Sequence, residues 1–233
     1  MKKLNSSVTD FCISLLIILT LAFAFISFQW ALASMWYFNA SYHIDEWSRS
    51  ELVDNRRDYD DALLSINKAI SYSSENPHYL HTKGKIIHWG IISKFEKQHK
   101  IKEIKEIYKT SLIYRESWPI VWSDLARINS LIEGLSIETQ SYIDKALFYG
   151  PYKKEVILEV FDIYMQNLSD LNSTQTLLFY KLLESFTNHP HLLKNILINA
   201  EEYGVAQIIC IQIKFNQKYK SLSSSWVKNE YCK

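Results

Sequence analysis

Apolar residues recur at helical spacing in the middle of the chain, between Glu116 and Pro151. Pro119 suits the first turn of a helix, and the apolar residues that follow it form one helical face: Val121, Trp122, Leu125, Ile128 and Ile132. Gly134 is expected to end this helix, and Ser136 is expected to cap a second one. The apolar stripe of the second helix contains Ile137, Ile143, Ala146 and Leu147 and stops at Gly150 and Pro151. The pattern therefore predicts a helical hairpin.

A similar alternation of small and large residues precedes this hairpin. Residues 58–72 resemble the second helix of a hairpin, and Pro77 suits the start of another helix. Gly84 and Ala126 occupy corresponding small positions about 42 residues apart, which is about eight more than the tetratricopeptide period of about 34. We expect the extra residues to form a polar loop near residues 94–102. The predicted architecture is a solenoid of tetratricopeptide-like hairpins, packed through Leu80, Gly84, Ile87, Trp122, Leu125, Ala126, Ile143 and Ala146.

The remainder of the chain favours an all-α fold class. Further apolar stripes at helical spacing lie between residues 152 and 204, where Pro190 suits a helix start and Gly204 a helix end. Residues 205–215 alternate as a strand would, but we predict a helix because an isolated strand has no partner. Only 5 Gly and 4 Pro interrupt the 233 residues, which favours long helices over many strands.

The segment from Phe11 to Phe28 carries no charge, which suits a transmembrane helix of about 20 residues. Lys2 and Lys3 precede this segment, and acidic residues with one arginine follow it at residues 45–49, so we expect the N-terminus to stay in the cytoplasm. A cleaved signal peptide is the alternative, because residues 31–33 form a small-x-small cleavage site. We favour a retained anchor because the apolar run exceeds the roughly 7–15 residues of the hydrophobic core of a signal peptide.

These features divide the chain into five expected parts. They are a cytoplasmic N-terminus at residues 1–10, a transmembrane anchor at 11–33, a polar stem at 34–57, one tetratricopeptide-like helical domain at 58–218 and a frayed tail at 219–233. Cys210 and Cys232 are either a disulfide or two separate thiols, because their spacing in the sequence does not establish a bonding distance.

Charge and motifs argue against several classes of function. With 26 Lys and Arg against 25 Asp and Glu, the net charge of +1 provides no basic field for nucleic acid. No nucleophile elbow, phosphate loop or dinucleotide glycine pattern occurs, so we predict a non-catalytic protein without a cofactor. His78 and His81 share one helix face, but no carboxylate or cysteine at ligand spacing completes a metal site, so no metal is predicted.

The predicted function therefore depends on a binding surface. In a tetratricopeptide stack the first helix of each hairpin lines the concave face, where residues beside the packing stripe meet partners. The residues expected to bind a partner are His78, His81, Lys85, Trp89, Ser123 and Arg127. This set is slightly basic and partly aromatic, which suits an extended polar ligand or a partner peptide.

Three runs of residues carry a resemblance to a known family. They are His88-Trp89 after the N-P-x-Y opening at residues 76–79, Arg115 with W-P-x-x-W-x-x-L-A at 118–126, and A-L-F-Y-G-P at 146–151. With the N-terminal anchor, they resemble the VpsP-type polysaccharide biosynthesis proteins of Gram-negative bacteria, which are small and have tetratricopeptide-like helices. The resemblance implies a non-catalytic protein of the inner membrane with a periplasmic body. It also implies that this body holds together the proteins of a polysaccharide synthesis or export system.

Two other functions remain open at this point. The same architecture suits a scaffold for another envelope system, such as secretion, cytochrome maturation or cell-wall synthesis. An enzyme that acts on a glycan would instead need an unrecognised site, either Asp124 with Arg127 or the pair of His78 and His81.

Overall fold

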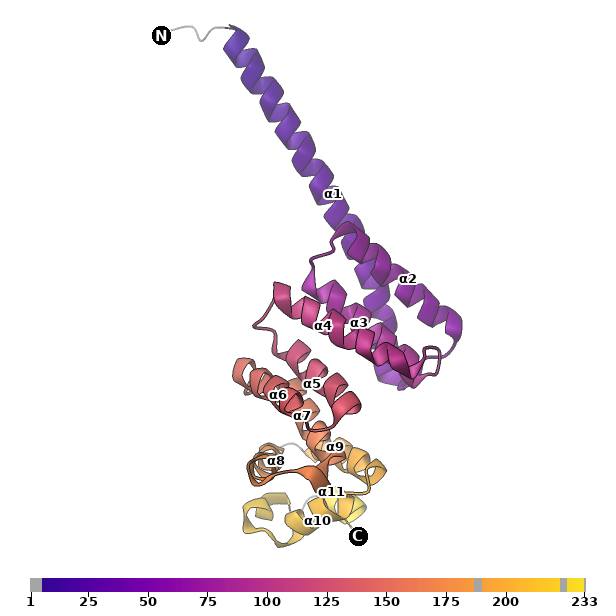
Figure 1. Ribbon diagram of the computed structural model, residues 1–233, viewed down its shortest axis with the longest axis vertical. Coiled ribbons are helices and arrows are strands. Elements are labelled where there is room, and N and C mark those ends of the chain that lie inside the picture. The colour runs from indigo at the N-terminus through magenta and orange to yellow at the C-terminus, as the bar shows by residue number, and fades with distance from the viewer. Residues whose placement is uncertain (1–5, 187–189, 223–225, 233) are drawn as a thin grey trace. The chain divides into compact units, whose positions relative to one another are not determined.

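A computed structural model describes residues 6–186, 190–222 and 226–232 of the chain. Helices account for 84% of the structure, and no strand occurs among the described residues, which confirms the all-α prediction. The chain forms two compact units, unit 1 at residues 1–115 and unit 2 at residues 116–233 (Figure 1). The single helical domain that we predict over residues 58–218 spans parts of both units.

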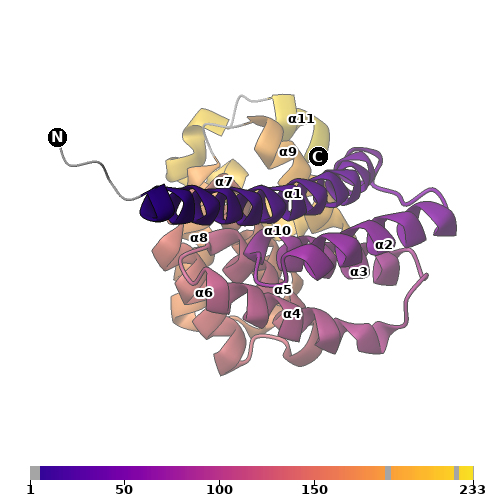
Figure 2. The ribbon, with the colours of Figure 1, turned by 90° about the horizontal axis from the view of Figure 1, so that it is seen from above.

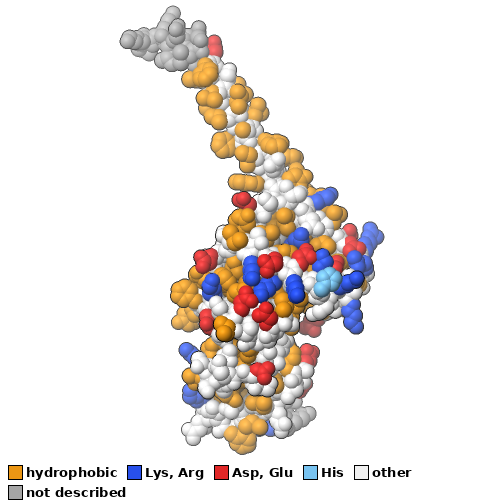
Figure 3. Space-filling view, in the orientation of Figure 1, with side chains coloured by type: hydrophobic (Ala, Val, Ile, Leu, Met, Phe, Trp, Pro, Cys, Tyr) orange, Lys and Arg blue, Asp and Glu red, His pale blue; other side chains and the backbone are white. Residues whose placement is uncertain are grey.

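Unit 1 begins with helix α1 (Ser6–Ser50), which is 45 residues long and carries the uncharged segment. The apolar side chains of its first half are exposed, and they cover the part of the helix that extends away from the rest of unit 1 (Figure 3). Among the described residues, α1 is the one helix that is long and apolar enough to cross a membrane. Lys2 and Lys3 lie outside the described residues.

Within the stem that we predict for residues 34–57, the second half of α1 is a helix that packs against the rest of unit 1. Ala40, Ile44 and Trp47 are buried against the rest of unit 1, and α1 contacts α2 (Arg56–Tyr72) along its length. Figure 2 shows the two helices side by side. The polar residues that suggested a stem occupy the outer face of α1, while every third or fourth residue points inward. Residues 34–50 thus form the first helix of a hairpin with α2.

The other hairpin of unit 1 joins α3 (Pro77–Ile92) and α4 (Ile101–Tyr114). Its helices are antiparallel, because the Ser111 hydroxyl near the end of α4 donates to the Pro77 carbonyl at the start of α3 over 2.9 Å. Asn76 caps α3 by accepting a hydrogen bond from the backbone N–H of His78. The inserted residues between the helices include a short 3-10 helix, η1 (Gln98–Lys100).

Unit 2 begins with the hairpin that the sequence pattern predicts, α5 (Pro119–Glu133) and α6 (Ile137–Tyr149). Gly134 ends α5 with a φ of 65°, and the Ser136 side chain caps α6 by accepting from the Thr139 N–H. Ile137 does not belong to the apolar stripe as we expected, since it is 93% exposed. Ile137 precedes the buried Ala146 by nine residues, and at about 100° per residue this spacing places it on the opposite face of α6.

The rest of unit 2 consists of α7 (Lys154–Gln166), η2 (Leu168–Asp170), α8 (Ser173–Ser185), α9 (Pro190–Glu202), α10 (Ala206–Phe215), η3 (Gln217–Leu222) and α11 (Trp226–Tyr231). The helix predicted over residues 205–215 is therefore confirmed. A disulfide joins Cys210 on α10 to Cys232, whose Cα atoms are 5.3 Å apart. The end of the chain is thus not the frayed tail that its serine-rich composition suggested, because α11 and this disulfide attach it to the unit. Residues 223–225 and 233 lie outside the described part.

Candidate functional site

The expected partner-binding residues of unit 1 lie on α3 but differ in exposure. His78 is exposed, and a nitrogen of Arg115 lies 2.9 Å from its Nε2 atom. His81 is buried against the Tyr108 ring, so the structure corrects the expectation that it lies on an open face. Lys85 is half-buried, and Trp89 is half-buried with its ring 6.3 Å from the Trp47 ring. In α3, His78 is therefore the exposed member of this set.

His78 also lines a hollow of about 520 Å³ at the start of α3. Its walls are formed by the middle of α1, the connection from α2 to α3 and the first turn of α3. The lining residues are Trp30, Ser34, Ser73, Glu75, Asn76, Pro77, His78 and Tyr79. Partial burial lowers the pKa of the His78 imidazole, and the charge of Arg115 lowers it further. The hollow thus favours a neutral imidazole and offers hydroxyl, amide and aromatic groups.

The expected partner-binding residues of unit 2, Ser123 and Arg127, lie in its interior. Ser123 is 1% exposed, and its hydroxyl donates to the Ile120 carbonyl over 2.8 Å. The Arg127 side chain is 12% exposed and donates through Nε to Glu159 Oε1 over 2.5 Å. The predicted concave face of α5 is covered because α7 packs against it. Sequence spacing identifies the stripe that faces the other helix of a hairpin, but not the face that the next hairpin covers.

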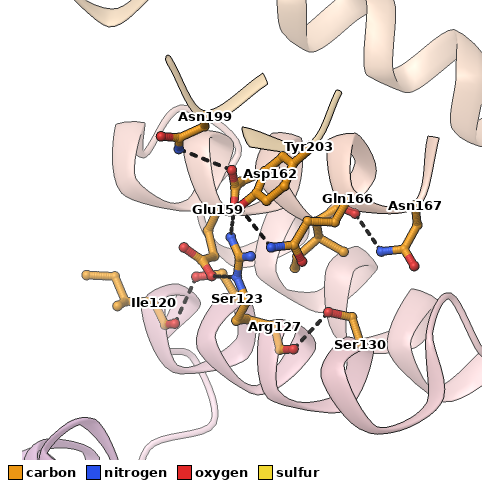
Figure 4. A network of polar contacts seen from close by, with 11 residues as sticks. Ile120, Ser123, Arg127, Ser130, Glu159, Asp162, Gln166, Asn167, Asn199 and Tyr203 are labelled. Carbon is orange, nitrogen blue, oxygen red and sulfur yellow. Dashed lines mark hydrogen bonds and ion pairs between the residues drawn. The ribbon is translucent and has the colours of Figure 1, made fainter. Parts of the chain in front are cut away.

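Arg127 belongs to a network of polar side chains that connects α5, α7 and α9 (Figure 4). Its guanidinium pairs with both Glu159 and Asp162 of α7. Asp162 also accepts hydrogen bonds from the Asn199 amide over 3.2 Å and from the Tyr203 hydroxyl over 3.1 Å. Side chains from three helices thus provide the ion-pair and hydrogen-bond partners of the buried charges in this network.

Burial and charge act in opposite directions on the ionisable groups of this network. Burial lowers the pKa of the Arg127 guanidinium, but the two carboxylates raise it more, so the net shift is upward. Burial raises the pKa of the Glu159 carboxyl, and Arg127 opposes only part of that shift. Arg127 thus remains charged, while Glu159 is the group whose ionisation burial disfavours.

This arrangement supports a structural role for Arg127. Each carboxylate oxygen that contacts Arg127 belongs to α7, and the other hydrogen bonds to Asp162 come from Asn199 of α9 and from Tyr203, the residue that follows α9. The enzymatic alternative required Arg127 to act together with Asp124, whereas its ion pairs are formed with Glu159 and Asp162. Within the described ranges, no group of three or more His, Cys, Asp or Glu side chains is placed to hold a metal ion.

The patterns in the sequence did not point to four members of this network, Glu159, Asp162, Asn199 and Tyr203. A signal for the carboxylates was present, because Glu159 and Asp162 stand three residues apart within an otherwise apolar run, V-I-L-E-V-F-D-I-Y. Acidic residues are rarely buried without a partner, so this run indicates a buried cation elsewhere in the chain. The sequence does not reveal that the cation is Arg127.

The residues that we assigned to repeat packing are all buried. Leu125, Ala126, Ile143 and Ala146 are fully inaccessible, and Leu80, Gly84, Ile87 and Trp122 are nearly so. Gly150 meets Pro119 where the end of α6 approaches the start of α5, since a Cβ on Gly150 would lie 2.6 Å from the Pro119 Cβ. The W-P and G-P runs therefore contact one another in the hairpin.

No family model matches this chain, and no curated protein matches it. The functional argument therefore depends on the residues and contacts described above.

Proposed function

We propose that the protein is a non-catalytic, membrane-anchored scaffold with tetratricopeptide-like hairpins that acts in the synthesis or export of a surface polysaccharide. In this proposal a single transmembrane helix holds it in the bacterial inner membrane, and both units lie in the periplasm. The proposal depends mainly on α1, in which an exposed apolar segment continues without interruption into a packed hairpin.

The exposed face of α1 supports the anchor. A soluble protein rarely exposes a contiguous apolar surface of this extent, and the segment has the length that a bilayer requires. The disulfide between Cys210 and Cys232 supports a periplasmic location for unit 2, because disulfides persist in oxidising compartments. These two features are independent, since they lie at opposite ends of the chain.

The hairpins support a scaffold of the tetratricopeptide type. Three antiparallel hairpins follow one another along the chain, formed by the second half of α1 with α2, by α3 with α4, and by α5 with α6. Small residues lie where the helices approach closely: a Cβ on Gly84 would lie 2.2 Å from the Tyr108 ring. The polysaccharide role is supported by the resemblance carried by residues 76–89, 115–126 and 146–151, which form parts of these hairpins.

A deletion strain tests this proposal. We expect loss of surface polysaccharide and of biofilm on deletion, restored by the full chain but not by residues 34–233 released into the periplasm. Unchanged polysaccharide in the deletion strain would contradict the role. Photo-crosslinking from His78 in solubilised inner membranes should capture polysaccharide synthesis or export proteins; capture of secretion or cell-wall proteins would instead favour another envelope system.

A further inference from the structure

The end of unit 1 near Trp30, where the proposed span of α1 ends, carries exposed aromatic side chains from more than one helix. The hollow beside α1 brings Trp30 and Ser34 together with Ser73 and Asn76 of the α2–α3 connection. Tyr72 is the last residue of α2 and precedes this connection. Tyr114 ends α4, and the adjacent Arg115 lies against His78 of the same hollow. The ends of α2 and α4 and the start of α3 therefore lie beside α1 near Trp30.

The position of Trp30 along α1 determines how far this end of unit 1 lies from the hydrocarbon layer of a bilayer. If α1 crosses the hydrocarbon layer with the apolar residues from Phe11 onward, about 20 residues bring the helix to the outer boundary at Trp30. Ser34 lies about 6 Å further along the helix. The headgroup layer on each side of a bilayer is about 5–7 Å thick. The α2–α3 connection lines the same hollow as this segment of α1 and hence lies at headgroup level.

The side chains at this end suit that layer. Trp30 is 64% exposed, Tyr114 is 46% exposed and Tyr72 is 39% exposed, while the neighbouring Ile113 is 78% exposed. Tryptophan and tyrosine are enriched at membrane–water interfaces because their rings are apolar and their tips are polar. The opposite end of unit 1 instead exposes charged residues, Glu51, Asp54, Lys94 and Lys97.

We infer that the edge of unit 1 formed by Trp30, Tyr72, Ile113 and Tyr114, here called the aromatic edge, rests in the headgroup layer of the bilayer that α1 crosses. This inference depends on the membrane anchor of the proposed function. The occupant is the lipid interface rather than a second copy of the chain, because the span ends at Trp30 and the edge lies at that level. Exposed charges near the edge are few and of both signs, Glu75 against Lys68 and Arg115, so the contact depends on aromatic and apolar groups rather than on anionic lipid.

Spin labels on the full chain in nanodiscs of zwitterionic phosphatidylcholine test the inference. Cys12, the free cysteine of the described chain, is replaced by serine, and the disulfide is left intact. Single labels are then placed at Phe23 in the span, at Ile113 in the aromatic edge and at Leu52 at the opposite end of unit 1. Leu52 is the matched control, since it is also an exposed apolar residue, at 58%. Collisions with oxygen and with a water-soluble nickel chelate are measured at each label.

The three positions distinguish failure of this inference from failure of the anchor. We expect the label at Phe23 to meet oxygen and exclude nickel, the label at Leu52 to meet nickel freely, and the label at Ile113 to lose most of the nickel collisions seen at Leu52. Equal nickel collisions at Ile113 and Leu52, with Phe23 in the bilayer, would overturn the inference and leave the anchor intact. A label at Ile113 that is shielded from both reagents would also overturn it, because a protein would then cover the edge. An aqueous label at Phe23 would contradict the anchor itself.

Discussion

Gly84 shows how one small residue sets the spacing between two helices. A Cβ at this position would lie 2.2 Å from Cε1 of Tyr108, whose ring is buried and has no room to move aside. Alanine is preferred over glycine within a helix by about 1 kcal/mol. Overpacking a core costs about 1–3 kcal/mol. For a change of Gly84 to alanine, the clash with the ring therefore lowers the free energy of unfolding, while the gain in helix propensity raises it.

We predict that Gly84→Ala lowers the free energy of unfolding because the clash outweighs the gain in helix propensity. Chemical denaturation of the detergent-solubilised chain, with hydrogen exchange to resolve unit 1, measures the change. In a Tyr108→Ala background the ring is absent, so Gly84→Ala should become neutral or stabilising by up to about 1 kcal/mol. An equal loss in both backgrounds would show that the tyrosine ring does not determine the need for glycine.

Arg127 forms ion pairs with two carboxylates, and its side chain is only 12% exposed. We predict that Arg127→Met lowers the free energy of unfolding of unit 2 by about 3–5 kcal/mol, because it leaves two carboxylates in a buried site. The control is Arg57→Met, whose side chain is 89% exposed and lies 3.9 Å from Asp61. That change should cost less than about 1 kcal/mol. Similar losses in the two variants would contradict a structural role for the network.

The Arg127→Met variant should also respond to pH. Burial already raises the pKa of Glu159 above its ordinary value of 4.5, and removal of Arg127 removes the main opposing charge. The folded state then binds a proton more tightly than the unfolded state, so stability is fully present below pH 4.5 and is lost as the pH rises through the folded pKa. We expect the deficit of Arg127→Met relative to the wild type to be larger at pH 7 than at pH 5. Adding Glu159→Gln should reduce this difference between the two pH values, and an unchanged difference would exclude Glu159 as the group that causes it.

These residues also mark the limit of what the sequence predicts. Apolar spacing identified Leu125, Ala126 and Ala146 as interior positions because each stripe faces the partner helix within its own hairpin. The same reasoning placed Ser123 and Arg127 on an open surface, since the packing of α7 against α5 is a contact between hairpins that no local pattern encodes. Polar residues that pair across such contacts are therefore the least predictable part of the candidate site.

Among the elements, α1 departs most from its predicted form. The change from apolar to mixed composition near residue 34 suggested a boundary between an anchor and a stem, but the helix continues to Ser50. Helix formation depends on local propensity and packing rather than on whether the outer face is in lipid or in water. The sequence thus predicted the anchor, while the hairpin of α1 with α2 became evident from the buried Trp47 and Ala40.

The element that holds the end of the chain is the loop closed by Cys210 and Cys232. These residues are separated by 22 positions, and closing a loop of that length is worth about 3 kcal/mol. We predict that reductant, or the double change Cys210→Ser with Cys232→Ser, lowers the unfolding temperature of unit 2 and leaves unit 1 unchanged. Reductant should have no further effect on the double variant. An equal shift in unit 1 would contradict a local role for this disulfide.

For the whole molecule, the proposed anchor predicts an intact N-terminus in the membrane. The alternative cleavage site at residues 31–33 lies inside α1, and Ala33 is fully buried against the α1–α2 hairpin. We expect a tag placed before Met1 to remain on the protein in isolated membranes and the intact mass to include residues 1–33. Release of a soluble fragment that begins at Ser34 would show that the segment is a signal peptide.

Because α1 is one continuous helix, the number of residues in its proposed span determines how unit 1 is rotated about the helix axis. Successive residues of a helix are turned by about 100° and raised by about 1.5 Å. One residue added between Phe11 and Phe28 would thus swing unit 1 through more than a quarter of a circle about the helix axis, whereas seven added residues would return it close to its original azimuth. The number of residues in the proposed span therefore sets the rotation of unit 1 about the axis of α1. That rotation determines which side of unit 1 would face a neighbouring protein in the membrane.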